Sequence, residues 1–344
     1  MKAVVYKQKG VFELEERPMP RILDPRDAIV RVTLCSICSS DLHIKHGSVP
    51  RAEPGVVVGH EMVGVVIETG EAVTGFRAGD RVTVNVETFC GECFYCKRGF
   101  VNNCVCGGWE LGCRIDGGQA EYVRVPFADC GLDRIPEGVS DEAALFTGDI
   151  LATGYWAAKI GGIGAGDTVA VLGAGPTGLC SMACAKLYHP AHIVAVDLRE
   201  DRLALAQREG FADIALNAAQ TDVAAALREM TEGRGADVVM EAAGDRDTLQ
   251  TAWQVARPNA TVCIVALYES PQALPLPQMY GKNLTFKTGG VDACDCGEIL
   301  RLIAAGKIDM RPLITYTLSL DRAMEAYDLF EQRRDNVIKV ALKP

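Results

Sequence analysis

The sequence predicts an α/β protein with two domains, one rich in antiparallel β structure and one built on a doubly wound parallel sheet. Its 344 residues exceed the size of one ordinary hydrophobic core. The first part of the chain carries short apolar–polar alternations punctuated by Gly, Pro and Asp, which is typical of antiparallel strands and turns. From about residue 168, β-branched runs alternate with segments of helical spacing, which indicates βαβ units.

The expected elements follow in chain order. Antiparallel strands are expected within residues 1–148 at KAVVYK, AIVRVTL, VGVVIETG and RVTVNV. Parallel strands are expected at TVAVLG, HIVAVD, DIALN, ADVVMEA and TVCIVAL, with helices such as DRLALAQREG and TDVAAALREMTEG between them. The end of the chain is expected to hold helices at about 294–305 and 321–333 and a last strand, VIKVALK.

Composition excludes several classes of protein. Apolar residues make up 49% and charged residues 23%, as in globular chains, and the formal net charge is −10. No Lys/Arg run could form the basic patch of a nucleic-acid binder. The apolar stretch at 169–187 is broken by glycines and a proline, so no membrane span is expected. Fourteen cysteines and a start, MKAVVYK, without a signal-peptide pattern indicate a reducing, cytoplasmic location.

A dinucleotide fingerprint lies in TVAVLGAGPTGL. The glycines of G-x-G-x-x-G follow a predicted strand and open a predicted helix, as the fingerprint requires. The first glycine permits a tight turn, the second lets the backbone approach a pyrophosphate at the helix N-terminus, and the third lets the helix pack on the sheet. The predicted cofactor-binding residues of this turn are Gly173, Gly175, Pro176, Thr177 and Gly178. The alternative is a tight strand–helix turn without a ligand.

Asp197 ends the next predicted strand, where a carboxylate binds the adenosine ribose hydroxyls and repels a 2′-phosphate. The expected cofactor is therefore NAD rather than NADP. Arg199 and Arg202 follow closely and could instead meet a phosphate, or simply lie on a solvated helix start.

Four cysteines, spaced C-x2-C-x2-C-x7-C, lie within CGECFYCKRGFVNNC. Cys90, Cys93, Cys96 and Cys104 have the number and spacing of a closed, structural zinc site, which leaves no open position for a substrate. Disulfides would need an oxidising compartment. A redox relay would usually show a single CxxC beside a βαβ unit. We therefore expect a structural zinc ion here and the catalytic groups elsewhere.

A second group of possible ligands lies at residues 35–61. A catalytic zinc site uses three protein ligands and keeps a fourth position open. Cys38, His60 and the adjacent Glu61 are the candidates.

Taken together, these motifs resemble the zinc-containing, medium-chain alcohol dehydrogenases from end to end. The motif G-H-E-x2-G-x5-G-x2-V is met by Gly59, His60, Glu61, Gly64, Gly70 and Val73, and C-x-S-D-x-H by Cys38, Ser40, Asp41 and His43. The resemblance implies a GroES-like catalytic domain over residues 1–152, completed by 292–344, and a Rossmann NAD-binding domain over residues 153–291. It also implies dimers or tetramers, the tetramer being usual for bacterial members.

The resemblance implies that Cys38 and His60 bind a catalytic zinc ion. The best-known members use a cysteine as third ligand, but the corresponding segment here, LFTGDILATGYW, offers Asp149. This is similar to bacterial secondary-alcohol dehydrogenases, in which Cys, His and Asp hold the zinc and Glu61 would match an exchangeable fourth ligand. Those enzymes often lack the four-cysteine zinc that this chain is expected to have. As an alternative, Asp149 could cap the helix that follows it.

Other roles follow from the same resemblance. Ser40 and His43 match a relay that carries the hydroxyl proton to solvent, and Trp109 matches a large residue of the substrate pocket. The residues that match positions beside the cofactor are Thr153, Val265, Ala266 and Leu267 at the nicotinamide and Lys339 at the phosphates. The alternatives are purely structural roles: a turn serine for Ser40, core packing for Trp109 and a solvated strand lysine for Lys339.

The expected activity is reversible hydride transfer between NAD and a secondary alcohol or diol, giving a ketone, with two zinc ions per chain. A polyol or sugar alcohol is the runner-up substrate class, and a bulky, steroid-like alcohol is a further alternative. A non-catalytic NAD-binding protein and a zinc-free reductase on the same scaffold are rivals. Both would usually have lost ligands or relay residues that are present here.

Overall fold

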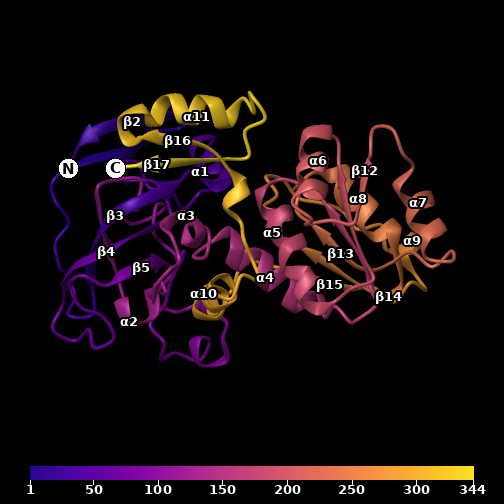
Figure 1. The fold of residues 1–344 in the computed structure, drawn as a ribbon, viewed down its shortest axis with the longest axis horizontal. Coiled ribbons are helices and arrows are strands. Elements are labelled where there is room, and N and C mark those ends of the chain that lie inside the picture. Colours follow the sequence, from indigo (N-terminus) through magenta and orange to yellow (C-terminus); the bar gives the residue numbers. More distant parts are fainter. The chain divides into compact units, whose positions relative to one another are not determined.

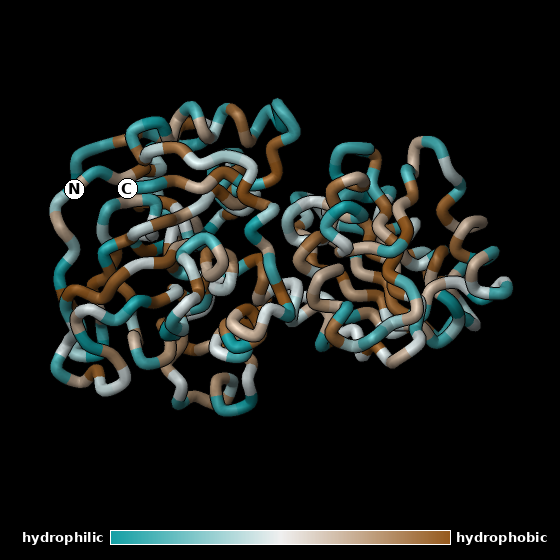
Figure 2. Tube along the Cα trace, viewed as in Figure 1, coloured by the Kyte–Doolittle hydropathy of each residue, from teal (hydrophilic) through white to brown (hydrophobic).

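The chain folds as two compact units, which the computed structural model describes over residues 1–344. Unit 1 comprises Met1–Ala152 and Asp292–Pro344, and unit 2 comprises Thr153–Val291 (Figure 1). In each unit the hydrophobic residues lie mainly along the strands (Figure 2). No helix is both long enough and apolar enough to cross a membrane.

Unit 1 is built on a seven-stranded sheet with the order β16-β17-β3-β4-β5-β9, in which β8 also pairs with β3. Its neighbours are antiparallel except for the parallel pair β16 and β17. The strands are β3 (Ala28–Ser36), β4 (Met62–Thr69), β5 (Arg81–Val84), β8 (Tyr122–Val125), β9 (Leu132–Arg134), β16 (Ile314–Ser319) and β17 (Lys339–Lys343). Two small sheets pair β1 (Lys2–Gln8) with β2 (Val11–Glu16), and β6 (Glu87–Thr88) with β7 (Gly108–Trp109).

Short helices connect these strands. They are α1 (Ser39–Lys45), α2 (Ala128–Gly131), α3 (Asp141–Ala144), α10 (Cys296–Ala304) and α11 (Ala323–Glu331), and α4 (Ile150–Gly161) contains the boundary between the units. Single 3₁₀ turns are η1 (Cys96–Arg98), η2 (Val101–Asn103), η4 (Arg311–Leu313) and η5 (Leu320–Arg322).

Close approach of β3 and β4 fixes the centre of unit 1. Val32 faces Gly64 in the register of the two strands. A Cβ atom on Gly64 would lie 2.2 Å from the carbonyl oxygen of Arg31, so only glycine lets the strands meet there. Val30 of β3 and Val66 of β4 lie opposite each other in this pair, and both are buried in the hydrophobic core. The register of the two strands is therefore set by packing as well as by hydrogen bonds.

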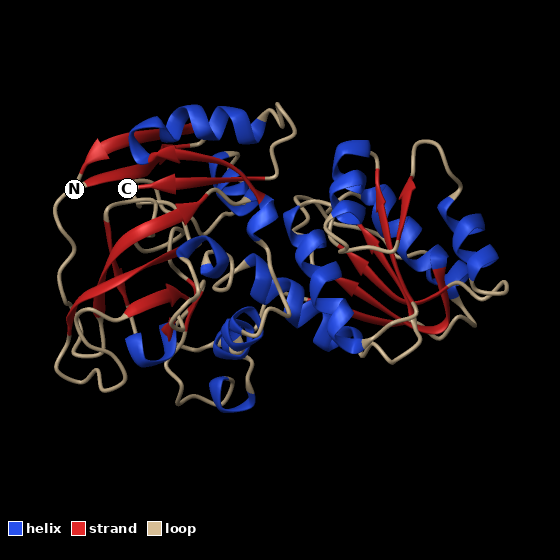
Figure 3. Ribbon diagram, in the orientation of Figure 1, coloured by secondary structure: helices blue, strands red, loops and turns tan.

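Unit 2 is a six-stranded sheet with the order β12-β11-β10-β13-β14-β15, and every neighbouring pair is parallel. The strands are β10 (Thr168–Leu172), β11 (His192–Asp197), β12 (Ile214–Asn217), β13 (Ala236–Glu241), β14 (Ala256–Ile264) and β15 (Thr285–Thr288). The helices are α5 (Pro176–Ala185), α6 (Glu200–Arg208), α7 (Val223–Met230), α8 (Arg246–Val255) and α9 (Leu276–Met279), with the 3₁₀ turn η3 (Lys186–Tyr188). They flank the strands (Figure 3). This strand order is that of a doubly wound, Rossmann-type sheet.

The predicted fold class is confirmed, and the differences concern individual elements. The strand expected at TVCIVAL begins earlier, at Ala256, and ends at Ile264, so Val265, Ala266 and Leu267 follow it. β15 was not predicted because TFKT is short and polar and lies at the sheet edge, where pairing needs only one partner. β16 was also missed, although ITYTLS alternates between half-buried and exposed side chains as a one-sided strand does.

Candidate functional site

Three side chains from separate segments of unit 1 meet in its interior. Cys38 precedes α1, His60 precedes β4 and Asp149 precedes α4, and all three are buried. Their ligand atoms all lie within 4.8 Å of one another. Asp149 Oδ2 is 3.5 Å from Cys38 Sγ and 3.3 Å from His60 Nε2. The carboxylate of Asp149 is thus turned toward the cysteine and the histidine.

The separations in this group fit a tetrahedral metal ion. Zinc binds oxygen, nitrogen and sulfur at 2.0–2.3 Å, which places neighbouring ligand atoms roughly 3.3–3.8 Å apart. One thiolate, one imidazole and one carboxylate make three ligands, the number that catalytic zinc sites use while they keep one position open. The donor set therefore fits zinc of the catalytic type.

The surrounding charges also favour a bound cation. Besides Asp149, the carboxylates of Asp41 and Glu61 are buried here, whereas the ammonium of Lys339 forms an ion pair with Glu61 alone. Buried carboxylates are costly unless cations or hydrogen bonds compensate them. A divalent ion would offset the excess negative charge.

Glu61 is next to His60 in the sequence, but its carboxylate is bound by Ser36 and Lys339 rather than by the three-residue group. Its Oε2 accepts a hydrogen bond from the hydroxyl of Ser36 (2.6 Å) and forms an ion pair with Lys339, while its Oε1 has no hydrogen-bond partner. Burial alone would lower the pKa of Lys339, but the carboxylate of Glu61 raises it above its ordinary value.

Lys339 does not occupy the place that the sequence suggested. We expected its side chain to reach the cofactor phosphates, with a solvated strand lysine as the alternative. Instead its side chain is 1% exposed, its ammonium is paired with Glu61, and it lies 5.5 Å from the ring centre of Phe146. A cationic side chain drawn into the interior is satisfied there by the nearest buried carboxylate.

Ser40, His43 and Trp109 lie around the three-residue group or on the helix that leads from it. Ser40 Oγ is 3.8 Å from Cys38 Sγ. His43 follows three residues later on α1, so both half-buried side chains share one side of the helix. The ring of Trp109 meets that of His60 edge to face, with centroids 5.3 Å apart. Trp109 is thus in contact with a candidate ligand.

The four cysteines at 90–104 form a second compact group. Their sulfur atoms all lie within 4.8 Å of one another, and neighbouring pairs are 3.4, 3.7 and 4.0 Å apart. The backbone N–H of Cys96 lowers the pKa of Cys93 to about 6, whereas burial raises the pKa values of Cys96 and Cys104. All fourteen cysteines of the chain are free thiols. The set fits a closed four-thiolate zinc site.

In unit 2 the glycine fingerprint forms the turn between β10 and α5. Gly173 has a φ of +98°, which favours glycine, and Gly175 is the N-cap of the helix. A Cβ on Gly178 would lie 1.8 Å from the carbonyl oxygen of Gly173. Pro176 and Thr177 are the first two residues of α5. The free N–H groups of a helix N-terminus beside a tight glycine turn form a phosphate-binding cradle.

Asp197 fastens this turn, a role that the motif alone did not predict. Its Oδ2 accepts a hydrogen bond from the N–H of Ala174 (2.7 Å) and its Oδ1 one from the N–H of Arg199 (2.9 Å). Arg199 forms an ion pair with Asp201, whereas Arg202 Nη1 lies 4.0 Å from Asp197 Oδ2. Of the two arginines, Arg202 is the one that borders the glycine turn.

The remaining predicted cofactor residues also belong to unit 2. Val265, Ala266 and Leu267 follow the carboxyl end of β14, the edge at which doubly wound sheets bind ligands. The N–H groups of Val265 and Ala266 both donate to the carbonyl of Glu241 (2.9 and 3.2 Å), and Leu267 is 48% exposed. Thr153 is half-buried on α4.

Comparison with known proteins places the chain in a family. The model of the alcohol dehydrogenase GroES-like domain matches residues 24–136, and that of the zinc-binding dehydrogenase matches residues 176–304. An alcohol dehydrogenase of Cupriavidus necator is 37% identical over 365 residues, covering 100% of this chain and 99% of the relative. The chain belongs to the zinc-dependent medium-chain alcohol dehydrogenases. It is an oxidoreductase that acts on the CH–OH group of a small molecule, and its cofactors are zinc and NAD or NADP.

Other relatives of this dehydrogenase are similar over nearly all of their length. The structure of an alcohol dehydrogenase from Thermus sp. ATN1 matches with a TM-score of 0.92 and 36% identity, covering 100% of this chain and 99% of that chain. An NADP-dependent isopropanol dehydrogenase of Thermoanaerobacter brockii is 31% identical, covering 94% of each chain.

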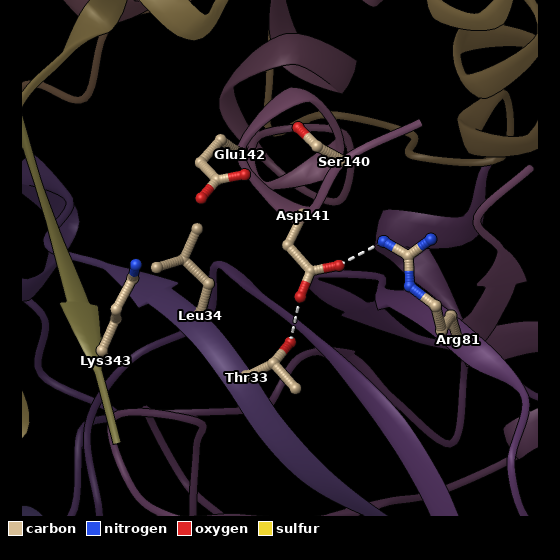
Figure 4. Close-up of a pocket in the computed structure, with 7 residues that line it drawn as sticks. All are labelled: Thr33, Leu34, Arg81, Ser140, Asp141, Glu142 and Lys343. Atoms are coloured by element: carbon tan, nitrogen blue, oxygen red, sulfur yellow. Dashed lines mark hydrogen bonds and ion pairs between the residues drawn. The ribbon is translucent and has the colours of Figure 1, made fainter. Parts of the chain in front are cut away.

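Unit 1 of the enzyme also has a surface hollow of about 530 Å³, which is separate from the three-residue group and from the four cysteines. It is lined by Thr33, Leu34, Arg81, Ser140, Asp141, Glu142 and Lys343 (Figure 4). The carboxylate of Asp141 points to Thr33 and Arg81 and binds both. None of the predicted ligand, relay or cofactor residues lines the hollow.

The segment that carries the four cysteines, residues 90–104, is called the four-cysteine lobe here, and it leads to a prediction about stability. The lobe contains only two single 3₁₀ turns, so a metal ion would be its main source of order. We expect Cys90→Ser to remove one of two zinc ions per chain and to lower the free energy of unfolding by about 3 kcal/mol or more. Turnover per folded molecule should stay within about twofold, because the three-residue group is elsewhere.

Zinc content by atomic emission, thermal melting and turnover would check this prediction. Cys106→Ser is the matched control, since this exposed thiol adjoins the lobe but lies outside the four-sulfur group. Normal zinc content and normal melting of Cys90→Ser would contradict it.

Proposed function

We propose that this enzyme oxidises a secondary alcohol or diol to a ketone, reversibly, with NAD as the hydride acceptor. Cys38, His60 and Asp149 hold the catalytic zinc, and Glu61, whose Oε1 lacks a partner, is an exchangeable fourth ligand. Cys90, Cys93, Cys96 and Cys104 hold the structural zinc. The observation that supports this proposal most strongly is that three buried ligand side chains converge at separations that suit one tetrahedral ion.

The side chains of unit 1 bind the alcohol and move its proton. Zinc, when bound, supplies Lewis-acid chemistry that makes the hydroxyl group more acidic. Ser40 accepts the hydroxyl proton and at the same time releases its own proton in the direction of His43, on the same side of α1, and solvent. Trp109 forms a wall of the substrate pocket against His60. The residues thereby orient the carbinol carbon for transfer of a hydride.

The side chains of unit 2 bind the cofactor. The N–H groups at the start of α5 bind the pyrophosphate, and Asp197 binds the adenosine ribose. The other proposed contacts are Gly173, Gly175, Pro176, Thr177, Gly178, Arg199 and Arg202 at the phosphates and ribose, and Thr153, Val265, Ala266 and Leu267 at the nicotinamide. The carboxylate of Asp197 favours NAD over NADP because it repels a 2′-phosphate.

A secondary alcohol is favoured over other substrates by Asp149 and Trp109. The isopropanol dehydrogenase of T. brockii, a relative at 31% identity, acts on such an alcohol by its name. We further propose that the enzyme is a cytoplasmic homotetramer. Support for the location comes from the fourteen free thiols, and the tetramer rests on resemblance to bacterial family members.

The third ligand gives a sharp test. Asp149→Asn replaces a carboxylate with a neutral, weaker ligand, so we expect zinc to fall from two to one per chain and kcat/KM to fall about 100-fold or more. Asp141→Asn, a change of the same kind at the surface hollow, is the control. Full zinc content and full activity in Asp149→Asn would show that Asp149 is not a ligand.

Cofactor preference should depend on the charge of Asp197. Asp197→Asn keeps an oxygen for the N–H of Ala174 but removes the negative charge. We expect the ratio of kcat/KM for NAD to that for NADP to fall by about tenfold or more. Asp213→Asn is the control, because Asp213 also accepts a backbone N–H, from Ile193, at the other end of β11. An unchanged ratio would refute the assignment.

The substrate class can be tested directly with the purified enzyme. NADH formation from NAD would be measured across small secondary alcohols, diols, polyols and a sterol, and then repeated with NADP and after zinc chelation. We expect chelator-sensitive turnover that is fastest with secondary alcohols or diols. Faster turnover of polyols or sterols would replace the substrate class. No turnover, with zinc and NAD bound, would indicate a non-catalytic NAD-binding protein.

A further inference from the structure

A line of four buried polar side chains leads from the C-terminal helix to the candidate ligand His60. Tyr327 on α11 donates its hydroxyl to Oε1 of Gln119 (2.7 Å), and Nε2 of Gln119 donates to Oδ2 of Asp41 (3.0 Å). The other oxygen of Asp41, Oδ1, lies 3.3 Å from Nδ1 of His60. The exposed fractions of all four side chains are 2% or less.

The hydrogen-bonding roles along this line are fixed by chemistry. A carboxylate only accepts, so the amide of Gln119 must present its NH₂ group to Asp41 and its oxygen to Tyr327. Burial raises the pKa of Tyr327 well above its ordinary value, so the phenol stays protonated and donates. Nε2 of Gln119 also donates to the carbonyl of Ser36 (3.2 Å), so both neighbours of the NH₂ group are acceptors. Removing the hydroxyl of Tyr327 would leave the buried amide oxygen without its donor, and the amide would be held less firmly against Asp41.

The same contacts turn one carboxylate oxygen toward the histidine. Oδ2 of Asp41 accepts from Gln119 and from the backbone N–H of Cys38 (2.9 Å). Oδ1 of Asp41 and Nδ1 of His60 have no other partner. A carboxylate at Nδ1 holds a ligating histidine in the tautomer that presents Nε2 to a metal ion. Nε2 of His60 is the atom that faces Asp149.

The backbone around Gln119 is shaped to admit its side chain. Gly59, next to His60, has a φ of +95°, and a Cβ there would lie 2.5 Å from Cγ of Gln119. The N–H of Gln119 also donates to the carbonyl of Val58 (3.0 Å). On the other side, the ring of Tyr327 packs edge to face on Phe12, with centroids 5.0 Å apart. The side chains of Gln119 and Tyr327 therefore both have fixed positions.

We propose that Gln119 and Tyr327 are positioning residues that set the zinc affinity of the Cys38–His60–Asp149 site by holding Asp41 against His60. Tyr327 acts through Gln119, and Gln119 acts through Asp41. The proposal rests on the zinc site proposed above. It extends that site by two side chains which touch neither the metal ligands' donor atoms nor the substrate.

The test measures zinc release from the complete enzyme. A chromogenic chelator takes up the zinc that the enzyme releases, and the rate of this release is measured. Release should occur in two kinetic phases, and the phase that is missing from His60→Ala belongs to the proposed site. We expect this phase to be about tenfold faster in Gln119→Met, which keeps the volume but loses the donor, and about threefold faster in Tyr327→Phe. The double variant should be no faster than Gln119→Met, because the tyrosine acts through the glutamine.

Two further measurements separate positioning from general loosening of the core. Tyr6→Phe is the matched control, since Tyr6 packs on the same Phe12 but lies outside the line, and its zinc release should equal that of the wild type. With Co²⁺ in place of zinc, the visible absorption bands should shift in Gln119→Met and Tyr327→Phe but not in Tyr6→Phe, because only the first two disturb the imidazole.

Each outcome decides one claim. Wild-type release rates and cobalt spectra in Gln119→Met and Tyr327→Phe would overturn the proposal, and so would fully additive effects in the double variant. If the wild type lacks any release phase that His60→Ala removes, the zinc site itself is wrong. The failure of the positioning role and the failure of the zinc site are therefore distinguishable.

Discussion

The antiparallel pairing of β3 with β4 is the constraint on which the site depends. Cys35 faces Met62 at the end of this pair, and the N–H of Ser36 donates to the carbonyl of Glu61 (3.1 Å). The chain therefore leaves β3 toward Cys38 at the point where it enters β4 from His60. Because neighbouring strands are about 4.8 Å apart, two residues that are distant in sequence arrive at ligand distance without a dedicated loop. The glycine at position 64 preserves this approach, since any side chain there would meet the backbone of Arg31.

A second consequence of the same pairing is a dense group of buried charges. β17 joins the other edge of β3, with Ala341 opposite Ser36, and this register delivers Lys339 to Glu61. One ammonium compensates one carboxylate, while Asp41 and Asp149 still face the imidazole of His60. Such a group is costly to bury without a further cation. The interior of unit 1 is thus better suited to a metal-bound state than to an empty one.

Much of the fold could be predicted from the sequence because its signals are local. The change from alternating runs to βαβ rhythm indicated both kinds of sheet, and the zinc-binding dehydrogenase family was indicated by motifs within short segments. Contacts that depend on long-range register could not be predicted in this way. Lys339 was expected at phosphates because its strand pairing was unknown, and its ion pair with Glu61 spans most of the chain. Gln119 and Tyr327 carried no motif, and only the packing of α11 brings them together.

These long-range contacts also explain why unit 1 needs both ends of the chain. Residues 38–61 supply two candidate ligands, but the ammonium beside Glu61 and the phenol behind Gln119 come from the last segment. Until β17 pairs with β3, Glu61 is a carboxylate without its cation and Asp41 lacks the fixed amide that orients it. A site of this kind has to form together with the closing of the sheet, because each buried polar group is stable only when its partner is present. We therefore expect metal binding to be coupled to completion of unit 1 by its C-terminal segment.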